Sequence, residues 1–158
     1  MTDDLPFTSP DRDRYLEDYV AGETHLLGSF IMIEAEMVEF SRQFDPQFFH
    51  IDKAKAEAGP FKGLIASAWH TSALLMKLYC AHYLSDASSL ASPGMDEVRW
   101  LVPVRPGDEL TVRVTVEGSR TSKSKPDRGV VQTYVEVKNQ NDVVVVSMKV
   151  VNMIARRP

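Results

Sequence analysis

The sequence predicts an α+β fold in which one long helix lies across an antiparallel sheet. Apolar residues recur at intervals of three and four between Ile65 and Leu84, around so much of the helix that it should be mostly buried. After Ser85 the chain is rich in valine and carries repeated turn residues, as expected for adjoining strands. A buried helix followed by such strands is typical of a layered α+β domain.

The size and composition favour a single globular domain. The chain has 158 residues, of which 44% are hydrophobic and 25% charged. Its net charge of −4 leaves no broad basic face for a nucleic acid. The longest apolar run is far too short to cross a bilayer, and the amino terminus lacks the pattern of a signal peptide. With only Cys80 it cannot form an internal disulfide, so we expect a cytoplasmic protein.

The first half of the chain predicts an arm, a strand and two short helices. Residues 1–24 are polar and weakly periodic, so we expect a peripheral N-terminal arm, and residues 25–158 form the predicted domain. A mostly apolar strand spans 25–33, and a helix starts at Glu34 and ends before Pro46. Residues 52–58 favour a second helix, before a tight loop that contains Gly59, Pro60 and Gly63.

The second half predicts four strands. One spans residues 98–104 and is ended by prolines, and the next, residues 110–116, alternates apolar and polar side chains. Strands over 130–138 and 143–154 are joined by Asn139-Gln140-Asn141-Asp142, which suits a hairpin turn. The basic segment 120–128 is interpreted as a solvated hairpin tip, with attraction of coenzyme A phosphates as the alternative.

Asp45 and His50 are the best candidates for chemistry. They lie five residues apart, with Pro46 and the aromatic residues Phe48 and Phe49 between them, so both polar groups could face a dry pocket. A carboxylate and an imidazole in such a place form a candidate acid/base pair. The alternative is structural, since Asp before Pro often forms a turn and a lone His often hydrogen-bonds to a neighbouring group.

Three blocks of sequence carry a resemblance to a known family. They are Phe44-Asp45, then His50-Ile51-Asp52 after four intervening residues, Gly63-Leu64-Ile65-Ala66-Ser67-Ala68-Trp69-His70, and Arg99-Trp100-Leu101-Val102-Pro103-Val104-Arg105-Pro106-Gly107-Asp108. In this order the blocks resemble the MaoC-like dehydratases, the hotdog-fold group that includes the (R)-specific enoyl-CoA hydratases. The resemblance covers roughly residues 25–155. It implies a single hotdog fold, an antiparallel sheet wrapped around a long central helix.

The resemblance also implies a function and a site. It points to a hydro-lyase that reversibly hydrates an enoyl-CoA or a related unsaturated acyl-CoA, with Asp45 and His50 as catalytic residues. Backbone N–H groups around Ala68 would stabilise charge on the thioester oxygen. The implied substrate-binding residues are Phe48, Phe49, Gly63, Ser67, Trp69 and His70. The implied partners are an acyl-CoA thioester and further copies of the chain, at least a dimer.

Some positions depart from the hydratase pattern, and this leaves alternatives open. Phe44, Gln47-Phe48 and Ala68 stand where hydratases usually have Gly, Asn-Pro and Gly, and Met76 stands where some members have a serine that supports the aspartate. The alternatives are an acyl-CoA thioesterase and a non-catalytic acyl-CoA-binding module. No Cys/His cluster has metal-ligand spacing, so we expect neither a metal nor another cofactor.

Overall fold

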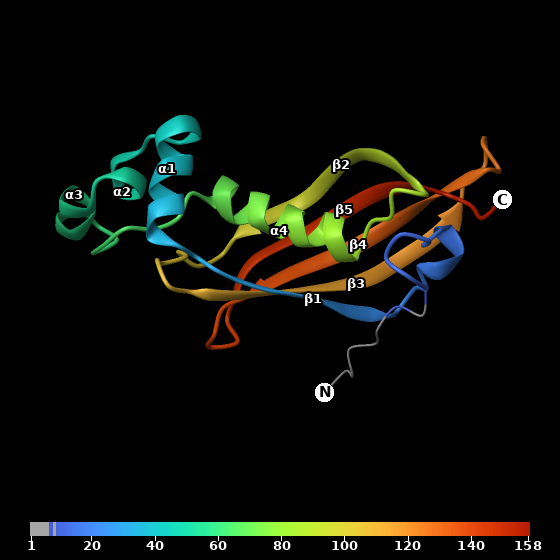
Figure 1. Ribbon diagram of the computed structural model, residues 1–158, viewed down its shortest axis with the longest axis horizontal. Coiled ribbons are helices and arrows are strands. Elements are labelled where there is room, and N and C mark those ends of the chain that lie inside the picture. Colours follow the sequence, from blue (N-terminus) through green and yellow to red (C-terminus); the bar gives the residue numbers. More distant parts are fainter. Residues whose placement is uncertain (1–6, 8) are drawn as a thin grey trace.

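A five-stranded antiparallel sheet forms the body of the protein. The computed structural model describes residue 7 and residues 9–158. The strands are β1 (Thr24–Ile31), β2 (Ser89–Trp100), β3 (Glu109–Thr121), β4 (Arg128–Lys138) and β5 (Val144–Ala155), in the spatial order β1-β3-β4-β5-β2. The helices are α1 (Glu34–Phe44), α2 (Phe48–Ile51), α3 (Lys53–Ala58) and α4 (Ala68–His82). Figure 1 shows α4 lying along the sheet and α1, α2 and α3 gathered at one end.

The core lies between α4 and the sheet. On β3 the alternate residues Leu110, Val112, Val114 and Val116 are all buried, which confirms the alternation predicted for this strand. From α4, Leu75 and Tyr79 belong to the same apolar cluster. The hydroxyl group of Tyr79 donates to Asn152 Oδ1 on β5 at 2.7 Å, so a hydrogen bond accompanies the apolar contact between helix and sheet.

The helix α4 starts later than the long helix that the sequence predicts. We expected it from Ile65, but α4 begins at Ala68. The amide of Ile65 donates to Phe49 O and the amide of Ala66 donates to Val104 O, so this segment bonds to neighbouring chain segments. These contacts hold it extended, and apolar periodicity alone could not reveal them.

The strand predicted over 98–104 is wrong in its bounds. The strand β2 spans Ser89–Trp100 and pairs with β5 through several register shifts. Positive φ angles at Ala91 and Gly94 accompany these irregularities. Because β2 is an edge strand with nearly every residue exposed, it carries no apolar alternation that would have marked its first half.

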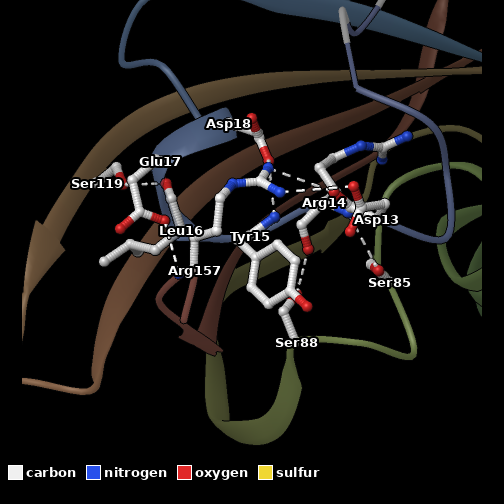
Figure 2. A network of polar contacts seen from close by, with 10 residues as sticks. All are labelled: Asp13, Arg14, Tyr15, Leu16, Glu17, Asp18, Ser85, Ser88, Ser119 and Arg157. Atoms are coloured by element: carbon white, nitrogen blue, oxygen red, sulfur yellow. Dashed lines mark hydrogen bonds and ion pairs between the residues drawn. The ribbon is translucent and has the colours of Figure 1, made fainter.

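Residues 9–19 pack against the rest of the molecule. Arg14 is fully buried, and Leu16 and Tyr19 belong to the core cluster. Figure 2 shows the backbone of Arg14 bonded to the side chains of Ser85 and Ser88. It also shows the side chain of Arg157, near the carboxyl end, bonded to Asp18. Gly129 on β4 allows the contact with Leu16, since a Cβ there would lie 2.4 Å from Leu16 Cδ2. Residues 1–6 and 8 of the predicted arm lie outside the described residues.

Two hairpins lie at opposite ends of the sheet. The turn predicted at residues 139–142 is confirmed, with the amide of Asn139 donating to Val143 O. The tip that joins β3 to β4 carries the basic segment, and Figure 1 places it at the end of the sheet remote from α1, α2 and α3. No helix in the described residues has the length and apolar character needed to span a membrane.

Candidate active site

Asp45 lies at the carboxyl end of α1, where two side chains hold its carboxylate. Gln47 Nε2 donates to Oδ1 at 2.8 Å, and Ser67 Oγ donates to Oδ2 at 2.7 Å. Burial alone would raise the pKa of Asp45, but the hydrogen bonds from Gln47 and Ser67 and the nearby His50 together lower it below the ordinary value. The carboxylate is therefore held in its ionised form and in one orientation.

His50 lies on the short helix α2 and is buried. Its Nδ1 lies 2.8 Å from the carbonyl oxygen of Ile65. Since a carbonyl oxygen can only accept a hydrogen bond, Nδ1 carries a proton and donates it. The other ring nitrogen, Nε2, lies 3.2 Å from Asp45 Oδ2. The extended segment before α4 thus fixes the ring so that Nε2 faces the carboxylate.

Asp45 and His50 open onto a cavity of about 340 Å³, referred to below as the Asp45 cavity. Its walls come from α2, the start of α4, the end of β2 and the segments beside them. The lining residues are Asp45, Gln47, His50, Ile65, Ala66, Ala68, Trp69, Thr71, Trp100, Leu101, Val102, Pro103, Val104, Val145 and Val146. Apart from a few polar groups the lining is apolar, which is typical of sites for small organic ligands.

The start of α4 leaves backbone donors unpaired beside this cavity. Ser67 is the residue that precedes the helix, and its side chain makes no capping bond because it donates to Asp45 instead. The amides of His70 and Thr71 donate to Ser67 O. Within the described part of the chain no hydrogen bond involves the amides of Ala68 or Trp69, and both residues line the cavity. A developing negative charge placed here would meet free N–H groups and the positive end of the helix dipole.

The remaining predicted substrate-binding residues are not part of the cavity lining. Phe49 packs edge-on against His50, with ring centroids 4.5 Å apart, and Phe48 packs against Phe49. His70 is buried and stacks on Phe40 at 4.8 Å. Gly63 lies beside Arg105 in the loop that precedes the extended segment. Their roles in binding substrate stay predictions.

Asp52, the second acid of the sequence motif, has a local structural role. Its Oδ1 accepts the amide of Lys55 at 3.1 Å, at the start of α3. This bond, the largest contribution, lowers the pKa of Asp52. Among the described residues no group of three or more His, Cys, Asp or Glu side chains is arranged to hold a metal ion.

Comparison with known proteins agrees with this architecture. The family model described as a MaoC like domain matches residues 11–141. The crystal structure of a MaoC-like dehydratase from Rhodospirillum rubrum is 36% identical, with a TM-score of 0.85 over 92% of this chain and 99% of that chain. The chain belongs to the MaoC-like dehydratase family. Its antiparallel sheet with helices is the hotdog fold that the family resemblance implies.

Two further proteins that are similar to this chain have names that state an activity. The 3-hydroxyacyl-thioester dehydratase Z of Mycobacterium tuberculosis is 30% identical over 112 residues, which cover 70% of this chain and 74% of the relative. The R-hydratase PhaJ1 of Pseudomonas aeruginosa is 22% identical, with a TM-score of 0.70 over 90% of this chain and 86% of that chain. At that identity the second likeness concerns the fold alone.

Sequence reasoning missed several contacts of the site. The bond from Ser67 to Asp45 and the bond from His50 to Ile65 O join segments more than ten residues apart. A serine next to a predicted helix start indicates a helix cap. It does not indicate a hydrogen-bond partner on another helix. Trp100 and Thr71 also line the cavity without having been predicted there.

Proposed function

We propose that the protein reversibly hydrates the double bond of an α,β-unsaturated acyl thioester, with coenzyme A as the carrier. The observation that carries this proposal is the Asp45–His50 contact at 3.2 Å beside the free amides at the start of α4. Hydration needs a base for the water, an acid for the α-carbon and donors for the thioester oxygen. The cavity brings residues suited to all three tasks together.

The polar pair suits a concerted proton transfer. The Asp45 carboxylate takes a proton from water as the water oxygen bonds to the β-carbon. The protonated His50 gives its Nε2 proton to the α-carbon as the double bond breaks. One proton then passes from Asp45 to His50 across their contact, which restores both groups and balances the reaction. The Ile65 carbonyl, bonded to Nδ1, stabilises the charged ring during this cycle.

The thioester oxygen fits against the start of α4. Charge that develops on this oxygen in the transition state would accept hydrogen bonds from the amides of Ala68 and Trp69. One such donor is typically worth about 3 kcal/mol in the transition state. Alanine at position 68 retains the backbone amide, but its methyl group narrows the approach of an acyl thioester to that amide. This position therefore influences which thioesters fit.

Single substitutions of the pair test the proposal. Asp45→Asn and His50→Ala should each lower the rate of hydration of crotonyl-CoA about a hundredfold or more, since each removes one partner of the proton transfer. The measurement is the loss of enoyl absorbance with purified protein. Ser124→Ala, at the exposed β3–β4 tip, is the matched control and should hydrate at the native rate. Equal rates for the native protein and both site variants would contradict the proposal.

Two further measurements, thiol release and the melting temperature, separate the two alternatives. A thioesterase would release free thiol from a saturated acyl-CoA without loss of a double bond. A binding module would show a higher melting temperature with acyl-CoA but no turnover. Either result with the native protein would replace hydration as the assignment.

We also infer that a second copy of the chain covers β2. This edge strand is 12 residues long and almost wholly exposed, and it carries the apolar side chains Leu90, Met95 and Trp100. An exposed strand edge with apolar side chains favours pairing with another chain. A homodimer formed there would lie next to the Asp45 cavity, which Trp100 also lines.

A further inference from the structure

Two tryptophans stand between the Asp45 cavity and a second, larger cavity. Trp69 lies on the first turn of α4 and Trp100 is the last residue of β2. Their ring centroids are 5.2 Å apart and the ring planes meet at 69°, an edge-to-face contact. Both residues line both cavities, so the ring pair forms the partition between them.

The second cavity, referred to below as the apolar cavity, has a volume of about 620 Å³. It lies between α4, β2 and β5, and its walls are mainly hydrophobic. The apolar side chains that line it beyond the tryptophans include Leu75, Met76, Met95, Val98, Met148 and Val150. Methionine side chains adapt to irregular shapes, so this lining suits a flexible hydrocarbon better than a rigid or polar ligand.

A hydrogen bond links Trp100 to the start of α4. Trp100 Nε1 donates to Ser72 Oγ at 3.4 Å, and Ser72 Oγ donates to Ala68 O at 2.8 Å. The indole is therefore oriented by the same helical turn that offers free amides to the Asp45 cavity. At the partition the two rings are themselves partly exposed, so they have space in which to change rotamer.

We propose that the Trp69–Trp100 pair determines which acyl chain lengths the protein accepts. With the rings in contact, an acyl chain whose thioester lies at Ala68 is confined to the Asp45 cavity, which favours short chains. A longer chain must displace the rings to reach the apolar cavity, and this displacement lowers its affinity and rate. The proposal rests on the proposed thioester site, and it adds the substrate class, short acyl chains.

Removing one ring should open the partition. Trp100→Ala is expected to raise the ratio of kcat/KM for dodecenoyl-CoA to that for crotonyl-CoA by about tenfold or more, since a few buried methylene groups carry that much discrimination. The ratio is the readout because Trp100 also lines the Asp45 cavity, so the absolute rates can fall together. Trp100→Phe retains an aromatic ring and should keep the ratio near that of the native protein.

A double substitution tests whether the gain depends on the apolar cavity. Val98 lies on β2 two residues before Trp100. It lines the apolar cavity but not the Asp45 cavity. Val98→Phe in the Trp100→Ala protein should fill the newly opened space and return the ratio toward the native value. Val143→Ala, at an exposed residue next to the β4–β5 turn, is the control and should leave the ratio unchanged.

Binding distinguishes failure of the partition from failure of the hydratase assignment. In Asp45→Asn protein, calorimetry with butanoyl-CoA and dodecanoyl-CoA should show that adding Trp100→Ala favours the longer ligand by a similar factor. This result is expected even if the native protein hydrates nothing. An unchanged ratio of long-chain to short-chain ligand in both assays would overturn the proposal. A Trp100→Ala substitution that changes only dimer formation would also overturn it, because a second copy of the chain would then fill the apolar cavity.

Discussion

Ser67 stands at a helix start but orients another residue. A serine in this position usually accepts a hydrogen bond from an amide of the first turn and so stabilises its helix. Here its hydroxyl group donates to Asp45 Oδ2, and the helix amides remain free at the cavity. This hydroxyl group thus orients the Asp45 carboxylate and leaves the amides of Ala68 and Trp69 free to bind a ligand.

Ser67→Ala should change the pH dependence of the reaction. The pKa of Asp45 is lowered in the folded protein, and the bond from Ser67 contributes to this shift, so its removal moves the pKa upward. Activity that needs the ionised carboxylate is present above this pKa and lost as the pH falls through it. The acid limb of the kcat/KM profile should therefore move to higher pH.

The same substitution should lower kcat/KM at neutral pH about tenfold, because a hydrogen bond to a charged group contributes about 1.5–3 kcal/mol. Ser67→Thr retains a hydroxyl group and should restore part of the rate and of the native acid limb. A variant that is slower but has an unshifted profile would contradict the role assigned to Ser67.

The carboxyl end of α4 is closed by a side chain from the amino-terminal segment. The last carbonyl groups of a helix lack partners within it and carry a partial negative charge. Arg14 Nη1 donates to His82 O at 2.7 Å and to Tyr83 O at 2.8 Å. The same guanidinium lies 3.7 Å above the Phe7 ring and pairs with Asp11. A segment predicted to be peripheral thus supplies hydrogen-bond donors to the carbonyl groups at the end of α4.

Arg14→Ala should destabilise the fold by about 3 kcal/mol, since it removes the buried donor of the hydrogen bonds to the carbonyl groups of His82 and Tyr83 and opens space beside Tyr83. Urea unfolding followed by circular dichroism measures the loss. Arg14→Lys should recover only part of it, because an ammonium group cannot reproduce the planar fork of donors.

Arg12→Ala is the control for this prediction, because Arg12 is an exposed neighbour and should stay within about 0.5 kcal/mol of the native protein. Equal stability of the Arg14 and Arg12 variants would show that the helix end needs no partner from this segment.

Over the whole molecule, the sequence predicts best where a pattern is repeated locally. The alternation along β3 and the helical periodicity of α4 each reflect contacts that one segment makes with a continuous apolar core, and the turn at 139–142 is held by bonds between neighbouring residues. The five-residue spacing of Asp45 and His50 likewise places both at the cavity.

The features that were missed depend on backbone contacts between distant segments. The first half of β2 is held by bonds to β5 and not by an apolar pattern, and the late start of α4 follows from bonds to Phe49 and Val104. A backbone amide or carbonyl looks the same at every position of a sequence, so no residue type marks these contacts. Arg14 was missed for a related reason, since its burial depends on partners that only the fold brings near.

The exposed edge strand predicts how the molecule associates. If β2 is the dimer interface, Met95→Lys at its centre should convert a dimer into a monomer at the same protein concentration, because a lysine on a strand edge opposes pairing. Leu26→Lys is the matched control, since Leu26 is an exposed leucine on β1, the strand at the other edge of the sheet. Sedimentation velocity measures both, and the control should remain dimeric. A native protein that sediments as a monomer, or a Leu26→Lys variant that alone dissociates, would place the interface elsewhere or remove it.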